Sequence, residues 1–256
     1  MNPNRTTTAF LGCLCGLLLL PVGGRAQVKL VEKPPSVPPA PAFKLPAVAE
    51  RRLPNGMRVV VVENKEQPLV SFSVMVRTGG TADPTGKAGL AQMTAALLDQ
   101  GTATRTAKQI AETIESAGGS ISASASWDAT TASSTVLANR AGLAAELLAD
   151  VLRNPAFKDE EIGRVRTQTL SGLQVSRADA GFVADEVFER VVFAGSPYAH
   201  PLGGTPETIR AMTRDDLVAF HKAHYRPDNA TLAIAIGTAM LWNFFVNRYW
   251  TYNDVE

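Results

Sequence analysis

The sequence predicts an α+β fold, in which helices pack against a mostly antiparallel sheet. Two apolar strand segments open the folded region, at residues 58–63 and 69–76, and helical patterns follow them. A strand pair that turns at Trp127-Asp128 interrupts the helices, and a last strand covers residues 231–236. Strands, helices, a hairpin, more helices and a final strand, in that order, are typical of this fold class.

Local signals support each element. Pro54-Asn55-Gly56 predicts a tight turn before the first strand. Thr106 is expected to cap a helix, and the acidic run at residues 159–161 favours a helix start because carboxylates stabilise the helix dipole. The apolar spacing predicts further helices at 89–100, 142–152, 159–177, 182–193 and 214–224, and strands at 120–126 and 129–137.

The N-terminus, residues 1–26, is typical of a secretory signal peptide. Arg5 supplies a positive charge, an apolar run extends from Ala9 to Val22, and Gly24-Arg25-Ala26 offers small residues for cleavage. Residues 27–46 are rich in proline, which fixes φ and removes a hydrogen-bond donor, so they are expected to form an extended linker. The protein is therefore expected in the periplasm or outside the cell.

Composition narrows the class of protein further. Both cysteines lie within the signal peptide, so the mature domain is expected to fold without disulfides. The formal net charge is +1, and without a strongly basic surface we expect no binding to nucleic acid. The apolar run of the signal peptide is shorter than the ~20 residues that a bilayer span needs, so no stable membrane span is expected after signal cleavage.

Residues 238–256 differ in character from the rest of the chain. Two of the three tryptophans and two of the four tyrosines lie in this segment, without a clean amphipathic pattern. We interpret it as an aberrant aromatic tail that follows a truncation or a change of reading frame. An adhesive tail at a membrane surface is the alternative.

Six short motifs, taken in order, resemble the insulinase/pitrilysin family of zinc metallopeptidases, an inverzincin family that includes the mitochondrial processing peptidases. The resemblance covers residues 47–237 and implies one peptidase-family domain, the N-terminal one. The motifs are Leu53-Pro54-Asn55-Gly56-Met57-Arg58-Val59, Gly89-Leu90-Ala91, Gly101-Thr102, Asn154-Pro155-Ala156-Phe157, Tyr198-Ala199-His200-Pro201-Leu202-Gly203-Gly204-Thr205 and His224-Tyr225-Arg226-Pro227-Asp228-Asn229-Ala230.

The resemblance implies a zinc site whose ligands this chain lacks. In the family, H-x-x-E-H on the first helix supplies two histidines and a glutamate, and a glutamate on a later long helix completes the site. Here the histidine positions hold Gln92 and Ala96, the glutamate position holds Ala95, and the long helix reads Leu170-Ser171-Gly172-Leu173-Gln174. Because zinc chemistry needs imidazole ligands and a carboxylate base, we expect no catalytic residue and no zinc in this chain.

His221 and His224 form an alternative metal pair, at i and i+3, with Asp215 or Asp216 nearby. We favour a plainer interpretation, in which basic side chains near a helix C-terminus are stabilised by the dipole. After this helix, Arg226 and Asp228 are expected to tie the helix end to the following strand.

A candidate peptide-binding strand carries Ser120, Ser122, Ser124 and Ser126. Alternating serines are typical of one face of a sheet. The resemblance implies in addition that strands of this sheet pair with extended substrate, for which an edge strand offers unpaired backbone groups.

From this resemblance we predict that the chain is an exported, peptidase-like protein and serves as a non-catalytic subunit. Such a subunit is expected to bind an extended peptide and a zinc-bearing partner subunit, with zinc only in the partner. Two alternatives stay open: a metalloendopeptidase with a non-standard metal site, and a truncated product without a stable function.

Overall fold

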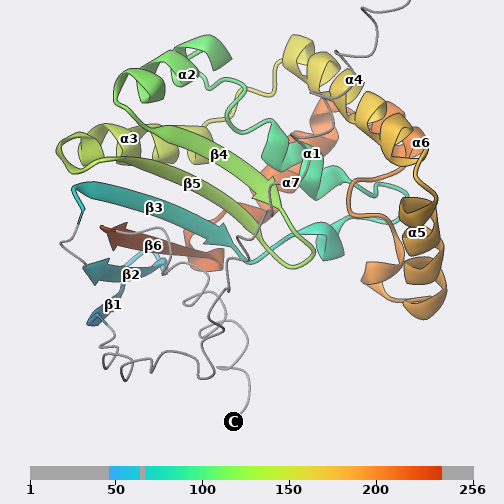
Figure 1. Cartoon of the computed structure of the whole chain (residues 1–256), viewed down its shortest axis with the longest axis horizontal. Coiled ribbons are helices and arrows are strands. Elements are labelled where there is room, and N and C mark those ends of the chain that lie inside the picture. Colours follow the sequence, from blue (N-terminus) through green and yellow to red (C-terminus); the bar gives the residue numbers. More distant parts are fainter. Residues whose placement is uncertain (1–45, 64–66, 238–256) are drawn as a thin grey trace, which may run out of the picture. The chain divides into compact units, whose positions relative to one another are not determined.

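A computed structural model describes residues 46–63 and 67–237 of the chain (Figure 1). The expected signal peptide, the linker except Pro46, and the aromatic tail lie outside these residues. None of the helices in the described ranges combines the length and the apolar character that crossing a bilayer requires.

In the described ranges, six strands form one sheet in the order β1-β2-β6-β3-β5-β4. Among these six described strands, only β2 and β6 run parallel, and every other neighbouring pair is antiparallel, so the predicted fold class is confirmed. The β4 strand lies at one edge. The strands are β1 (Val48–Arg52), β2 (Arg58–Glu63), β3 (Leu69–Val76), β4 (Ser120–Ala125), β5 (Thr130–Leu137) and β6 (Ala230–Ile236).

Helices pack against one face of this sheet (Figure 1). One apolar cluster joins β3 and β5 to α2 and α3, with Phe72, Val136, Ile110 and Leu147 among its buried members. A second cluster joins α1 to α4 and α7. The helices are α1 (Leu90–Ala96), α2 (Ala107–Ser116), α3 (Ala141–Arg153), α4 (Asp159–Ser176), α5 (Ala180–Val192), α6 (Pro206–Ala211) and α7 (Arg214–His224).

Three elements differ from their predictions, and the first is β1, which was not predicted as a strand. The first helix was expected to reach residue 100, but α1 ends at Ala96, because the N–H groups of Leu97, Leu98 and Gln100 bond three residues back and tighten the chain into turns. The prediction also missed α6. Its local signals are present in the sequence, since Thr205 caps it and Pro206 stands at its first position.

Candidate functional site

The α1 helix carries the positions that correspond to the zinc motif, and it packs as a core helix. Ala95 has no exposed surface, and Ala96 packs against the same apolar cluster. Gln92 is half-buried, and its side-chain oxygen accepts a hydrogen bond from the backbone N–H of Ala125 at 3.3 Å. The side chain at the first ligand position therefore joins α1 to the end of β4.

The α4 helix offers no ligand either. Leu173 is buried in the cluster that holds α1, and Leu170 packs against that cluster. Ala95, Ala96 and Leu173 have no donor atoms, whereas zinc in proteins takes histidine nitrogen, cysteine sulfur or carboxylate oxygen. These residues do not fit a zinc ion, and no metal-dependent step follows from their arrangement.

The two candidate metal histidines of α7 lie in partly buried, aromatic surroundings. The Nε2 atom of His221 faces the carbonyl oxygen of Leu152 at 2.8 Å, and the ring of His224 packs against Phe220. Burial lowers the pKa of both histidines, and Arg226 lowers that of His224 further. The His221 nitrogen that faces Leu152 is thus already occupied by a backbone contact.

The acidic residues at the start of α7 do not join these histidines. Asp216 accepts hydrogen bonds from Thr213 at the helix start and pairs with Lys87 at 2.5 Å. Within residues 46–63 and 67–237, no group of three or more His, Cys, Asp or Glu side chains is placed to hold a metal ion. The described part of the chain therefore gives the His221 and His224 pair no third ligand.

The outer edge of β4 presents backbone groups on alternate residues. The N–H of Ser126 donates to the carbonyl oxygen of Ala129 across the hairpin at 2.7 Å. Because bonding directions alternate along a strand, the N–H and C=O groups of Ile121, Ala123 and Ala125 point outward. Of these three residues, Ala125 already donates to Gln92.

The serine side chains of the candidate peptide-binding strand do not lie along this outer edge. The side chains of Ser120, Ser122 and Ser124 are exposed, whereas those of Ile121 and Ala123 pack toward the helices. The serine hydroxyls therefore line the other face of the sheet. Their β5 partners in register, Thr135 and Ser133, contact hydroxyls of β3 there, and Ser126 is exposed in the hairpin turn.

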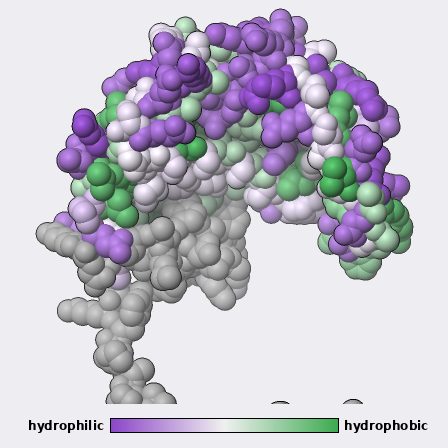
Figure 2. Space-filling view, turned by 45° about the horizontal axis from the view of Figure 1, so that its top comes forward, coloured by the Kyte–Doolittle hydropathy of each residue, from purple (hydrophilic) through white to green (hydrophobic). Residues whose placement is uncertain are grey.

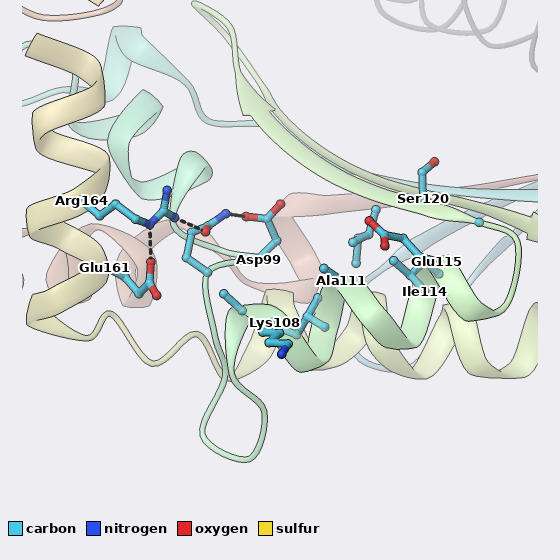
Figure 3. Close-up of a pocket in the computed structure, with 13 residues that line it drawn as sticks. Asp99, Lys108, Ala111, Ile114, Glu115, Ser120, Glu161 and Arg164 are labelled. Carbon is cyan, nitrogen blue, oxygen red and sulfur yellow. Dashed lines mark hydrogen bonds and ion pairs between the residues drawn. The ribbon is translucent and has the colours of Figure 1, made fainter. Parts of the chain in front are cut away.

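A cavity of about 480 Å³ lies beside the first residues of β4, and Figure 3 shows its lining. The α2 helix contributes apolar side chains, including Ile110, Ala111 and Ile114. Figure 3 draws Glu115 of α2 on one side of the cavity and Asp99 on the other. The cavity thus combines an apolar floor with the carboxylates of Asp99, Glu115 and Glu161 and the cationic side chains of Lys108 and Arg164.

A chain of polar contacts forms the wall that carries Asp99 (Figure 3). Arg164 of α4 donates to Glu161 at 2.8 Å and to the side chain of Gln100, and Gln100 donates to Asp99. Burial raises the pKa of Asp99 above its ordinary value, and the hydrogen bond from Gln100 and the charge of Arg164 offset this effect only in part. The fold therefore holds a carboxylate where its charge is disfavoured.

Replacing Asp99 by asparagine is expected to leave the free energy of unfolding unchanged or to raise it at about pH 7. A raised pKa means that the folded state binds a proton more readily than the unfolded chain, so wild-type stability rises as pH falls through the folded pKa toward ~3.9, the unfolded value. The advantage of Asp99→Asn should shrink over that range. Urea denaturation at several pH values checks this, with the exposed Asp185→Asn variant as control; a clear loss of stability at neutral pH contradicts it.

Glycines in two of the motifs bring distant segments into contact. Gly89, before α1, has φ +90°, and Gly204 has φ +76°. A Cβ atom on Gly204 would lie 2.5 Å from the carbonyl oxygen of Ala88, and one on Gly89 would lie 2.9 Å from Gly204. The glycines of these two motifs therefore allow the segments around the start of α1 to pack closely.

Other motif residues have the same role. His200 faces the carbonyl oxygen of Gly80 with Nε2 at 3.0 Å. Arg226 and Asp228 pair with each other at 2.7 Å inside the turn before β6, and the side chain of Asn229 donates to the carbonyl oxygen of His224 at 3.1 Å. The side-chain tie to the end of α7 was predicted for Arg226 and Asp228, but Asn229 of the same motif makes it.

Comparison with models of known protein families shows the family to which the chain belongs. The family described as Insulinase (Peptidase family M16) matches residues 58–205, a segment that contains both α1 and β4. The chain belongs to the insulinase family, peptidase family M16. The M16 resemblance inferred from short motifs is thereby confirmed.

Two curated M16 relatives show how much of such a protein the chain covers. An uncharacterized zinc protease of Rickettsia bellii is 30% identical over 184 residues, which are 72% of this chain and 45% of the relative. A probable mitochondrial-processing peptidase subunit beta of Arabidopsis thaliana is 28% identical over 183 residues, 72% of this chain and 34% of the relative. The chain spans less than half the length of these relatives.

Solved structures show the same M16 fold. The crystal structure of a peptidase M16 inactive domain from Pseudomonas fluorescens has a TM-score of 0.71 and 27% identity, and the match covers 74% of this chain and 46% of that one. A protease from Helicobacter pylori has a TM-score of 0.71 at 21% identity, covering 82% of this chain and 51% of that one, which supports the fold alone.

Proposed function

We propose that this M16 chain is an exported, non-catalytic subunit that binds an extended peptide and a zinc-bearing M16 partner. The observation that carries the proposal is the replacement of the zinc ligands by packing side chains next to β4, which is an edge strand of the sheet that the described residues form. Ala95 and Leu173 belong to the core, while Ile121 and Ala123 direct backbone groups outward beside the 480 Å³ cavity. Export is supported by the signal-peptide pattern of the sequence.

Peptide binding by strand addition suits the geometry of β4. An extended segment that pairs with an edge strand takes affinity from main-chain hydrogen bonds and specificity from the pockets that receive alternate side chains. Side chains of a peptide beside Ile121 would point to the helix side, where the cavity lies. Its apolar floor and its mixed lining of carboxylates and cationic side chains favour a side chain with an apolar stem and a polar end.

Partner binding has support from the surface of α5. No residue of this helix is buried, and its exposed apolar side chains gather on one face, which includes Val187, Phe188 and Val191. Figure 2 shows apolar surface at the side of the molecule where Figure 1 places α5. Contiguous exposed apolar surface is typical of interaction sites. Co-purification of the chain with a zinc-bearing M16 relative tests this part of the proposal; a chain that stays monomeric and leaves that relative's activity unchanged overturns it.

Replacing Ala123 by proline is expected to reduce peptide binding by at least about tenfold and to leave the fold intact. Proline removes the outward N–H, which an incoming strand needs, and a proline is tolerated at an edge strand where no ladder bond is lost. Titration with a capped peptide of alternating valine and threonine, followed by fluorescence anisotropy, measures the effect.

The matched control for this variant is Ser122→Pro. The N–H of Ser122 points toward β5, so this substitution is expected to destabilise the sheet, as circular dichroism and urea denaturation would show. Equal affinity of wild type and Ala123→Pro for the peptide would exclude the outer edge of β4 as the binding surface.

A further inference from the structure

The side chain of Gln92 bonds to one of the three residues whose backbone groups point outward from the β4 edge, Ala125. Its side-chain oxygen accepts the N–H of Ala125 at 3.3 Å, although 33 residues separate the two in the chain. Gln92 belongs to α1, whose end lies beside the end of β4 in Figure 1. A helix side chain therefore satisfies a backbone group that an added strand would otherwise use.

The remaining outward groups define a short pairing surface. Outward residues of a strand recur every two positions, ~6.8 Å apart. Before Ile121 the chain turns from α2, where the N–H of Gly119 bonds to the carbonyl oxygen of Ile114. An incoming strand that pairs with Ile121 and Ala123 therefore meets the Gln92 amide when it reaches Ala125.

We propose that Gln92 is a stop that ends strand addition at Ala125 and so sets the register of the bound peptide. The inference rests on the proposed binding of peptide to β4. A ligand of this edge is then a short extended segment, or a longer one that leaves the sheet direction at Gln92. Gln92, at the first position of the zinc motif, thus limits how many residues of the peptide can pair with β4.

Glutamine is chemically suited to this position. Its amide oxygen accepts the Ala125 N–H, and a glutamate carboxylate would also do so, whereas methionine has a similar length and only a weak acceptor. Gln92→Met removes the hydrogen bond that holds the side chain against Ala125, so that the flexible, unbranched methionine can turn away from the edge, and Gln92→Glu keeps this bond. Gln168→Met, at an exposed position of α4, is the matched control for the substitution itself.

The experiment compares two capped peptides of alternating valine and threonine, about five and about nine residues long, which span ~17 and ~30 Å when extended. In the wild type, in Gln92→Glu and in Gln168→Met, both peptides are expected to bind with the same affinity. In Gln92→Met the longer peptide is expected to bind about 2- to 12-fold more tightly, the effect of one further hydrogen bond, with no change for the shorter one. The same length dependence in wild type and Gln92→Met overturns the proposal.

Amide hydrogen exchange provides a measurement without peptide. The Ala125 N–H is expected to be protected in the wild type and in Gln92→Glu and to exchange faster in Gln92→Met, while the N–H groups of Ile121 and Ala123 exchange fast in all three. If neither peptide binds any variant, the proposed peptide binding fails, and the register stop fails with it, even where Ala125 is protected. If peptides bind and Ala125 is unprotected in the wild type, the stop fails alone.

Discussion

The variant that combines Gln92→His, Ala95→Glu and Ala96→His is expected to lose about 3–5 kcal/mol of unfolding free energy and to gain no peptidase activity. Ala95 has no exposed surface and lies in the cluster that joins α1, α4 and α7. A glutamate there places an unpaired carboxylate among apolar side chains. Activity stays absent because α4 presents Leu173 where the third ligand would come from.

Two measurements separate the parts of this prediction. Urea denaturation of Ala95→Glu alone is expected to account for most of the loss, and Gln92→His with Ala96→His should be milder, because both positions are only half-buried. Hydrolysis of a quenched fluorescent peptide in the presence of zinc measures activity. Cleavage of this peptide by a folded triple variant, if it stops when a chelator is added, would show that the replaced side chains alone complete a zinc site.

Replacing Gly204 by alanine is expected to destabilise the fold by about 2–4 kcal/mol. Part of the loss comes from φ +76°, which costs a non-glycine residue about 1–2 kcal/mol. The rest comes from the new Cβ atom, which would lie 2.5 Å from the carbonyl oxygen of Ala88 and 2.9 Å from the side chain of Ile209. Since Ala88 precedes α1, the strain acts directly on the helix that carries the lost motif.

Gly86 is the matched control for this substitution. Its φ is +80°, and a Cβ atom there would meet nothing within 4 Å. Thermal or urea unfolding of Gly86→Ala should therefore report the backbone cost alone, and the difference between the two variants reports the close contact with Ala88. Equal losses in Gly86→Ala and Gly204→Ala would contradict a packing role for the motif.

Local signals predicted most elements because they act over a few residues. Thr106 caps α2 as expected, in a reciprocal pair with Gln109, and α7 has the predicted limits. The α6 helix was missed although Thr205 and Pro206 mark its start, because six residues give too little periodicity for a pattern to emerge.

Long-range features lay beyond sequence reasoning. The apolar spacing of α5 predicted a helix, and such a face usually points into the core, yet here Val187 and Phe188 are exposed. The contact between Gln92 and Ala125 depends on the tertiary packing of α1 against β4. Only the fold shows that Asp99 and Glu115 face one cavity, since Asp99 follows α1 and Glu115 lies in the last turn of α2.

We expect this M16 chain to keep the peptidase fold without a metal centre, and the zinc content of the purified chain measures this. The purified chain is equilibrated with Zn²⁺, separated from free metal by gel filtration, and measured by elemental analysis beside a relative that carries H-x-x-E-H. We expect zinc far below one ion per chain, with no change when His221 and His224 are replaced by alanine. One zinc per chain, lost on chelation together with peptide cleavage, would contradict it.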